Sequence, residues 1–401
     1  MKPVYVAAYH QSTFGKLKGM GVPEIVANAV NGTCREIGVE AHSLDVASIG
    51  ATCNISLNEQ GLLAGLVAQV PGLAAKPIES VENACASGGQ AVLSVIQKLQ
   101  CGLGDTGIAL GYEKMRDVEG RMDGKLIGKV LGFFSHPEER PGKTFVFPHL
   151  FAEVMDLYLK THGYTEEHLA AIAVQEYANA RHNPYAQMRN VELTVEKACE
   201  IEGINRYIAE GLKLKTFDCS QITDGYAGLV LATEAGLARL GVAKKDCVRL
   251  AGWGQATDPL KKQGRDVLCP RGAYTAMNGA YAMAGVKAAD VNVAELHDCF
   301  TVMGAIGTEV IGKAEYGKGA QYWVDGKAAP SGECGINTSG GLIAKGHPIG
   351  ATGVAMIGWC AWQLLGKAPK ELQVKNARAA ATFNIGGPIC ASVCTVLTPA
   401  A

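Results

Sequence analysis

Short apolar runs rich in β-branched residues alternate with a helix-like run along the N-terminal part of this chain. The strand candidates are 3–8, 46–53, 77–81 and 106–110, and a helix-like stretch covers 90–99. Many of the 50 glycines stand at the ends of apolar segments, where turns are expected. Because strands separated by helices are joined by crossovers, the alternation predicts parallel pairing and a layered α/β sandwich.

The second half of the chain repeats this order of elements. GVEAHSLDVASIGATC from Gly38 aligns with GVKAADVNVAELHDCF from Gly285, with five of sixteen positions identical. The turn and helix after Cys85 have a counterpart in 346–365, and the strand candidate 106–110 has one in 378–383. The offset is not constant, but the pattern predicts two related α/β halves.

Residues 116–215 differ from both halves. They carry many charges, the segment HPEERPGKTFVFPH and amphipathic helical runs at 152–162 and 166–180. Insertions of this kind at the edge of an α/β core commonly shape a ligand site. The predicted division is an N-terminal half 1–115, an inserted loop and helical domain 116–215, completion of the first half with a crossover 216–270, and a C-terminal half 271–401.

Composition excludes several classes of protein. The net charge is −1, so no basic bias indicates nucleic-acid binding. No apolar stretch reaches the length of a membrane span, and the N-terminus has too short an apolar run for a signal peptide. The thirteen cysteines form no CxxC pair and no Cys/His cluster with zinc spacing, so no metal site is predicted. The last residues, TPAA, contain no peroxisomal targeting tripeptide, so we expect reduced thiols and a cytoplasmic location.

Cys85 is the first candidate for chemistry. It lies in ENACASGGQAV, between a predicted strand and a predicted helix. The positive end of a helix dipole lowers a thiol pKa, and small neighbours let a substrate approach the backbone. The sequence therefore predicts a nucleophile, with a buried structural cysteine as the alternative.

Three further motifs carry polar groups that suit the same chemistry. His347, in NTSGGLIAKGHPIGATG, could exchange a proton with a thiol, or be an ordinary loop histidine. AELHDCF ends a predicted strand in His297, Asp298 and Cys299, at the edge where α/β sheets bind ligands, or it is a turn with a structural aspartate. In FNIGGPICASV, the N–H groups at Gly386 and Gly387 suit an oxyanion hole, or the glycines form a tight turn.

Together these motifs resemble those of the thiolase family, and the resemblance runs through nearly the whole chain. The similar segments are VAAYHQSTFGKLKGM, the Cys-Ala-Ser at Cys85, GYEKM at Gly111, DCSQITDGYAGLVL at Asp218 and GHPIGATG at Gly346. The resemblance implies the thiolase fold: two related βαβαβ-type halves in a layered α-β-α-β-α sandwich with an inserted loop domain.

Two departures indicate a subgroup. Many thiolases carry Asn-Glu-Ala-Phe where this chain has His297-Asp298-Cys299-Phe300, and a Cys-x-Gly loop where it has Asn384-Ile385-Gly386. Both departures, with HNPYAQMR at His182, resemble the sterol-carrier-protein type of thiolase. In that type the second acid/base cysteine is the one in the HDCF motif. Because the chain stops at 401, no lipid-transfer domain is expected after it.

The resemblance implies an acyl-CoA C-acyltransferase that cleaves a 3-ketoacyl-CoA, or condenses two acyl-CoAs, through an acyl-Cys85 intermediate. His347 would deprotonate Cys85, and Cys299 would serve as acid or base at Cα. One oxyanion site would use the N–H groups of Cys85 and Gly386, and the other His297 and His347. Ser220 would touch the pantetheine arm, with Asn384 and Asp298 in support. Coenzyme A would be a substrate, with no metal and no tightly bound cofactor.

Other functions stay open at this point. A ketoacyl-synthase-like condensing enzyme and a retro-aldol enzyme share the implied fold, but Cys299 and Cys85 respectively argue against them. A non-catalytic scaffold or lipid-binding subunit is a third alternative. The acyl group and the direction of reaction are not determined, and acetoacetyl-CoA is the default substrate.

The resemblance also implies partners. A homodimer or tetramer is expected, and a small subunit of the zinc and oligonucleotide-fold (OB) type could help to hold CoA. No dense basic cluster stands out for the CoA phosphates. The candidate cations are Arg206, Lys213, Lys215, Lys261 and Lys262.

Overall fold

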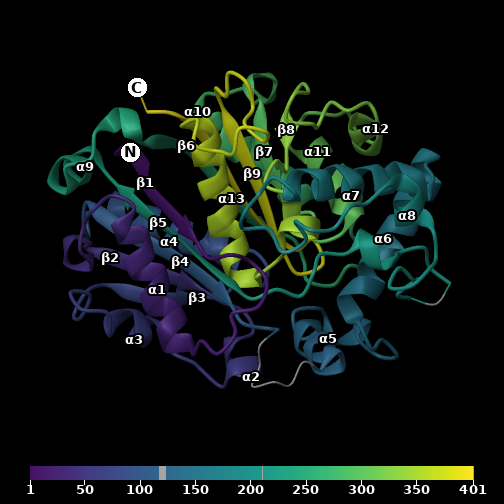
Figure 1. Cartoon of the computed structure of the whole chain (residues 1–401), viewed down its shortest axis with the longest axis horizontal. Helices are drawn as coiled ribbons and strands as arrows, with labels where there is room; N and C mark the ends of the chain where they lie inside the picture. Colours follow the sequence, from purple (N-terminus) through teal and green to yellow (C-terminus); the bar gives the residue numbers. More distant parts are fainter. Residues whose placement is uncertain (117–122, 210, 401) are drawn as a thin grey trace.

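The computed structural model describes residues 1–116, 123–209 and 211–400. Within these ranges ten strands pair into one sheet (Figure 1). The strands are β1 (Val4–Gln11), β2 (Val46–Gly50), β3 (Ile78–Val81), β4 (Thr106–Glu113), β5 (Gly225–Ala232), β6 (Val248–Thr257), β7 (Val293–Leu296), β8 (Gly335–Ile336), β9 (Ala380–Gly386) and β10 (Ala391–Pro399).

The helices of the core and of the intervening segments are interleaved with these strands. In the N-terminal half they are α1 (Val22–Arg35), α2 (Asn54–Asn58), α3 (Leu63–Ala68) and α4 (Ser87–Gln100). Between β4 and β5 they are α5 (Gly124–Gly132), α6 (Val146–His162), α7 (Glu166–Ala180) and α8 (Val195–Cys199). The C-terminal part adds α9 (Glu234–Leu240), α10 (Arg271–Ala284), α11 (Thr301–Val310), α12 (Gly319–Val324) and α13 (Ile349–Leu364).

The strand order shows an internal repeat. The order is β3-β2-β4-β5-β1-β6-β10-β9-β7-β8, with β1 and β6 paired at the centre. Outward from this pair, β5, β4, β2 and β3 on one side match β10, β9, β7 and β8 on the other. The aligned segments from Gly38 and Gly285 each contain a short 3₁₀ turn followed by equivalent strands, β2 and β7. The prediction of two related halves is confirmed.

The pairing directions differ from the prediction. β2 pairs in parallel with β3 and β4, and β7 with β8 and β9, but the other pairings in the described part of the chain are antiparallel. The expectation of parallel pairing is therefore wrong for half of the sheet. One reason is local: β9 and β10 are joined by a tight turn at Gly387, and strands joined so closely must run antiparallel.

The sheet bends around a central helical layer. α4 and α13 pack together, and their apolar residues share one buried cluster with strands of both halves. Another cluster joins α1 and α3 to the outer face of the first half, and a third joins α10 and α11 to the outer face of the second. In Figure 1, α13 lies in the middle, with the N-terminal elements on one side and β7 and β9 on the other. This is the predicted α-β-α-β-α layering.

The segment between β4 and β5 forms a helical region beside the C-terminal half (Figure 1). The predicted helical runs 152–162 and 166–180 correspond to α6 and α7, and α6 begins earlier, at Val146. Apolar residues of α6 and α7 share the large cluster of α11, which fixes this region against the core. The boundaries between the four predicted segments stay a prediction.

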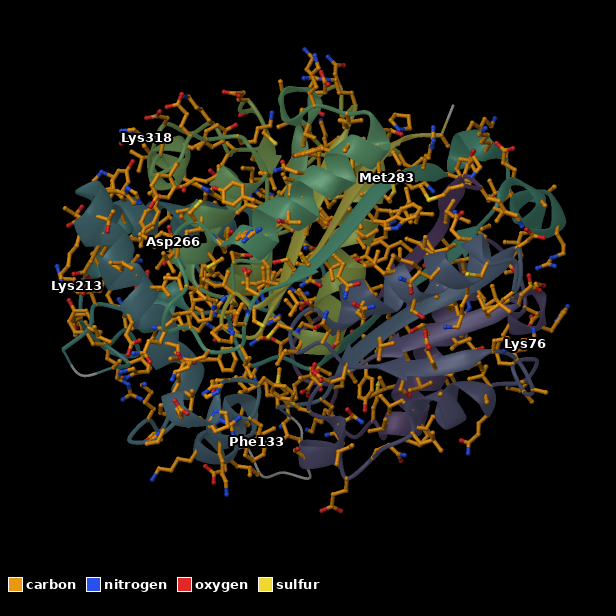
Figure 2. The ribbon with its side chains drawn as sticks, turned by 180° about the vertical axis from the view of Figure 1, so that it is seen from behind. Lys76, Phe133, Lys213, Asp266, Met283 and Lys318 are labelled. Atoms are coloured by element: carbon orange, nitrogen blue, oxygen red, sulfur yellow. The ribbon has the colours of Figure 1, made fainter. Side chains whose placement is uncertain are left out.

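Charged side chains lie mainly on the outside, as Lys76, Lys213 and Lys318 do in Figure 2. All thirteen cysteines fall within the described ranges and are free thiols. No helix in those ranges is both long enough and apolar enough to span a bilayer.

Candidate active site

Three segments that are far apart in sequence meet where strands end. Cys85 lies between β3 and α4, His297 directly follows β7, and His347 precedes α13. The Sγ atom of Cys85 and one ring nitrogen of each histidine all lie within 4.8 Å of one another. The two imidazole rings meet edge to face, with their centroids 4.8 Å apart. The structure thus brings together three of the predicted catalytic side chains.

The Cys85 loop is held in an uncommon conformation. Ala84 has a φ of 47°, in the left-handed region that non-glycine residues seldom adopt. The Ala84 carbonyl accepts hydrogen bonds from the hydroxyls of Thr52 (3.0 Å) and Ser87 (2.6 Å), and the Ser87 hydroxyl also accepts the N–H of Asn83 (2.8 Å). These bonds fix the turn that presents the thiol just before α4 begins.

His347 is positioned by two anchors. Before it, the turn Gly341–Lys345 has π-helical hydrogen bonding, and Asp298 accepts the N–H groups of Leu342 and Ile343 there. The N–H of His347 itself donates to the Thr223 hydroxyl at 3.0 Å. Asp298 is buried and does not line the cavity described below, so it supports the site by holding the chain that leads to His347.

The hydrogen bonds at Nδ1 assign the tautomer of His347. Its Nδ1 lies 2.7 Å from the hydroxyl oxygen of Thr352, and that hydroxyl donates to the Pro348 carbonyl at 3.0 Å. With the hydroxyl proton directed to Pro348, we assign a proton to Nδ1 and the role of its acceptor to Thr352. The Nε2 atom is buried with no partner in the described part of the chain, so it carries a free lone pair. This nitrogen can accept the thiol proton.

His297 takes the opposite tautomer. The amide nitrogen of Asn384 lies 3.1 Å from the Cys85 carbonyl and 2.9 Å from Nδ1 of His297. A carbonyl can only accept, so the –NH₂ group faces it, and the same group donates to Nδ1. The proton of His297 therefore sits on Nε2, which is buried and has no partner among the described residues. Such an N–H can stabilise a developing oxyanion.

These tautomers also bear on metal binding. Cys85, His297 and His347 are residue types that bind transition metals. With a proton on Nε2 of His297, however, only Cys85 and His347 offer a lone pair to the shared space. The arrangement fits acid–base chemistry better than a three-ligand metal site.

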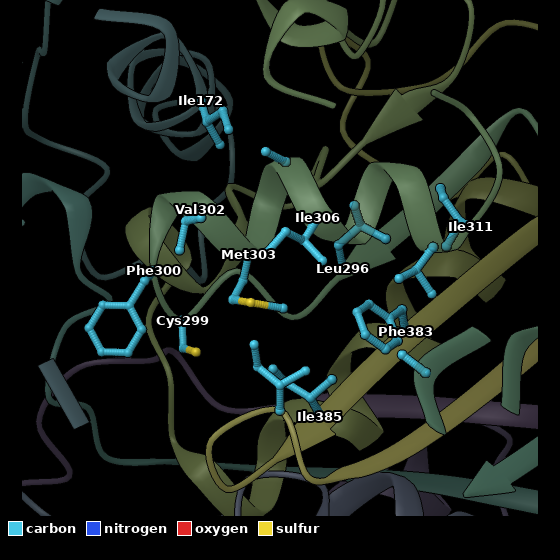
Figure 3. Packing of buried hydrophobic residues seen from close by; sticks show 14 of the residues in the cluster. Ile172, Leu296, Cys299, Phe300, Val302, Met303, Ile306, Ile311, Phe383 and Ile385 are labelled. Carbon is cyan, nitrogen blue, oxygen red and sulfur yellow. The ribbon is translucent and has the colours of Figure 1, made fainter. Parts of the chain in front are cut away.

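Cys299 lies at the entrance to α11, beside Phe300 (Figure 3). Its carbonyl accepts the N–H of Ser220 at 2.9 Å, which joins the HDCF segment to the strand-like stretch around Cys219. The side chain is buried, and burial, the nearby Cys85 and Asp298 raise the pKa of its thiol well above the usual value. A thiol that stays protonated can donate a proton to a carbanion.

Burial controls the protonation of the reacting groups. It raises the pKa of the Cys85 thiol to about 12, reinforced by the Glu113 carboxylate and opposed by the N–H groups of Gly387 and Cys85. Burial, with the nearby Lys345 cation, lowers the pKa of His347 to about 3. The expectation of a depressed thiol pKa is therefore wrong, because the cost of desolvating the thiolate outweighs its stabilisation by the helix N-terminus. The resting pair is a neutral thiol and a neutral imidazole.

The predicted catalytic side chains open into one large cavity of about 540 Å³. Cys85, His297, Cys299 and His347 line it, and so does the predicted pantetheine contact, Ser220. Gly387 lines it too, with its N–H directed to the Cys85 thiol. Gly386, the predicted oxyanion donor, lies one residue earlier at the end of β9, so close to the Cys85 loop that a Cβ would come within 2.3 Å of the Asn83 carbonyl. The role of Gly386 stays a prediction.

Comparison with known proteins agrees with this geometry. The profile "Thiolase, N-terminal domain" matches residues 4–235, and "Thiolase C-terminal domain-like" matches residues 254–399. The chain belongs to the thiolase family. It is 33% identical over 387 residues to the acetyl-CoA acetyltransferase of Methanothermobacter thermautotrophicus, covering 96% of this chain and 97% of that protein.

Two further proteins are similar to this thiolase-family chain. It is 32% identical to sterol carrier protein 2 of Bos taurus over 79% of its own length and 58% of the length of that protein. The solved structure of an "Ltp2-ChsH2(DUF35) aldolase" superposes with a TM-score of 0.80, covering 99% of this chain and 98% of that chain. At 19% identity the latter shows a shared fold alone.

Four of the five cations proposed from the sequence for the CoA phosphates form ion pairs with carboxylates. Lys215 is fully buried and lies 2.8 Å from Glu166 and 3.2 Å from Asp218, so it cannot reach a phosphate. Lys213 also faces Glu166, at 3.6 Å. Lys261 and Lys262 pair with Glu138 and Glu153. Arg206 is exposed and lines the cavity.

Sequence reasoning missed two residues that support this site, Thr352 and Glu113. Thr352 sits within the GHPIGATG motif, but it is five residues after His347, a spacing that no helical neighbour rule connects. Glu113, in GYEKM, is fully buried and accepts the N–H groups of Thr52, Cys53 and Gly350. It ties the Cys85 side of the site to the start of α13, and nothing local in its sequence signals that.

Proposed function

We propose that this chain is an acyl-CoA C-acyltransferase of the thiolase type, which cleaves a 3-ketoacyl-CoA with CoA or runs the reverse condensation. The observation that carries the proposal is the Cys85 thiol beside two histidines of opposite tautomer, within 4.8 Å, at one end of a large cavity. The acetyl-CoA acetyltransferase relatives support the same reaction class.

In the first step, Nε2 of His347 takes the proton of Cys85 as the sulfur attacks the 3-keto carbon. Because burial disfavours a free thiolate, proton transfer and attack should be coupled. The new oxyanion would be met by N–H groups at the Cys85 loop and the Gly386–Gly387 turn.

In the second step, the bond between C2 and C3 breaks, and its electron pair passes to the thioester enolate. The Nε2–H of His297 stabilises the enolate oxygen, and Cys299 donates its proton to C2. The proton that His347 took from Cys85 then restores the Cys299 thiol, which leaves Nε2 of His347 free again. A second CoA thiol takes the acyl group from Cys85, and its proton passes through His347 to the departing Cys85 sulfur. Condensation follows the same steps backwards, with Cys299 as the base.

The alternatives explain the site less well. A decarboxylating condensing enzyme needs no second cysteine at the reacting carbon, yet Cys299 lines the cavity beside Cys85. The aldolase of similar fold is too distant in sequence to transfer its reaction. A scaffold would have no need for complementary histidine tautomers.

We further propose a homo-oligomer, located in the cytoplasm, in which a small partner subunit completes the CoA site. Arg206 is the one cation of permanent charge among the described residues that line the cavity, whereas CoA carries several phosphate charges. The solved aldolase of similar fold carries two components in its name, Ltp2 and ChsH2(DUF35), which supports a second chain beside this fold. Saturation of the isolated chain by micromolar CoA would show that no partner is needed.

A Cys299→Ala variant tests the roles directly. Acyl exchange between acetyl-CoA and labelled CoA needs only Cys85 and His347 and should persist. Condensation to acetoacetyl-CoA should fall by about 10² or more, because the base at Cα is gone. Cys101→Ala, an exposed cysteine far from the cavity, is the matched control. Undiminished condensation in Cys299→Ala would refute the assignment.

A further inference from the structure

One wall of the active-site cavity is strongly apolar and aromatic. The inserted region and the HDCF segment together supply Ile127, Leu131, Phe134, Phe147, Phe151 and Phe300. The rings of Phe151 and Phe300 stack with centroids 4.5 Å apart, and Phe151 in turn stacks on Phe147 at 6.3 Å. An acetyl or acetoacetyl group would leave most of this wall without contacts.

Helix α5 presents its wall residues through a simple pattern. Gly128 and Gly132, four residues apart, face the start of α6: a Cβ on them would come within 2.9 Å of Phe145 and of Val146. The neighbouring face carries Ile127 and Leu131, again four residues apart, and these line the cavity. The close contact between the glycine face of α5 and the start of α6 thus fixes the positions of Ile127 and Leu131.

These wall residues adjoin the nucleophile itself. Ile127 belongs to a small buried cluster against which Cys85, Leu131 and Phe134 all pack. Leu131 and Phe134 also pack against the larger cluster that contains Phe151, Phe300 and Cys299. An acyl group attached to Cys85 would therefore extend along Leu131 and Phe134 toward the aromatic wall.

Apart from the cysteines and histidines, the polar lining residues lie outside the apolar wall segments, at Thr52, Arg206, Tyr207, Thr216, Ser220 and Gln221. Arg206 and Tyr207 are exposed, which places them at the mouth. Besides Arg206, no lining residue in the described ranges is an Asp, Glu, Lys or Arg. A charged acyl group would have no counter-ion in the apolar part.

We propose that the site takes 3-ketoacyl-CoAs with long, uncharged, apolar acyl chains in preference to acetoacetyl-CoA, and that Leu131 and Phe134 set the chain length. This inference rests on the thiolase reaction proposed above. It departs from the acetyl-CoA acetyltransferase name of the similar archaeal proteins.

Thiolysis by the full wild-type chain tests the substrate class. The substrates are acetoacetyl-, 3-ketohexanoyl-, 3-ketooctanoyl- and 3-ketodecanoyl-CoA, assayed with CoA. We expect kcat/KM to rise about fourfold for each added CH₂ until the pocket is full. A maximum at acetoacetyl-CoA would overturn this inference and leave the proposed function intact. Failure to cleave any of the four would overturn the function itself.

Variants on α5 test the residues. Leu131→Phe should lower the ratio of kcat/KM for 3-ketodecanoyl-CoA over acetoacetyl-CoA at least about tenfold, since a larger ring shortens the pocket. Leu126→Phe is the matched control, because Leu126 is on the same helix, 41% exposed, and does not line the cavity. It should keep the wild-type ratio.

Phe134→Ala supplies a second, opposite perturbation should Leu131→Phe fail to fold. Removing the ring lengthens the pocket, so the optimum should move to a longer chain than in wild type. Thermal melts check that each protein is folded. An unchanged ratio in a folded Leu131→Phe protein, or an unchanged optimum in Phe134→Ala, would overturn the assignment of these two residues.

Discussion

Replacement of Thr352 by valine tests the tautomer of His347, on which its role as base depends. Thr352 is 2% exposed in the first turn of α13, and valine has nearly its shape. The change removes the acceptor 2.7 Å from Nδ1 of His347 and little else near the ring. The Nδ1–H tautomer then buries an unpaired donor, so the ring favours a proton on Nε2 instead. That proton would point at the Cys85 thiol and block transfer.

The magnitude follows from the cost of the unpaired donor. A buried unsatisfied N–H costs about 1–3 kcal/mol, and each 1.4 kcal/mol is about tenfold in an equilibrium constant or rate. Thr352→Val should therefore lower kcat for thiolysis roughly 5- to 150-fold. The rate of Cys85 alkylation by iodoacetamide should fall in parallel, because the same lone pair assists removal of the thiol proton.

Thr352→Ser separates this effect from a packing defect. Serine keeps the hydroxyl and loses a methyl group, so it should retain most of the activity while showing its own small loss in thermal stability. Kinetics and melting curves on the three proteins decide the matter. Wild-type kcat and alkylation in a folded Thr352→Val protein, or equal losses in both variants, would refute the tautomer assignment.

Three other predictions rest on the same geometry. Because partial burial raises the pKa of Cys85 to about 12, its alkylation rate should keep rising with pH, and a plateau below pH 9 would contradict a neutral resting thiol. Burial raises the pKa of Glu113 from its ordinary 4.5 to about 7, so this group favours the folded state below pH 4.5 and that contribution is lost as pH rises through 7. Glu113→Gln should thus remove about 3 kcal/mol of pH dependence from the unfolding free energy between pH 4.5 and 7, measured by urea titration. If the unfolding free energies of wild type and variant change with pH in parallel, the prediction is wrong. Asn384→Asp should draw the proton of His297 to Nδ1 and lower condensation about 10²- to 10³-fold, and a wild-type condensation rate would argue against His297 as a donor.

Local sequence predicted several of the elements and the residues that the structure brings together in the candidate site. Short β-branched runs predicted β1 to β4, although not β5, and amphipathic spacing predicted α7 with its observed ends. The repeat from Gly38 and Gly285 predicted two equivalent halves, because equal patterns of apolar residues bury equal faces. The motifs also identified Cys85, His297, Cys299 and His347 as the side chains that line one cavity.

Tertiary structure decided how those residues behave. The free lone pair of His347 depends on Thr352, and the proton on His297 depends on Asn384, which reaches across from β9. Thiol pKa values depend on burial and on Glu113, whose three N–H donors come from two distant segments. Lys215, a candidate for phosphate contact from the sequence, is buried between two carboxylates. Protonation and pairing are set by which groups share a low-dielectric space, and no local pattern records that.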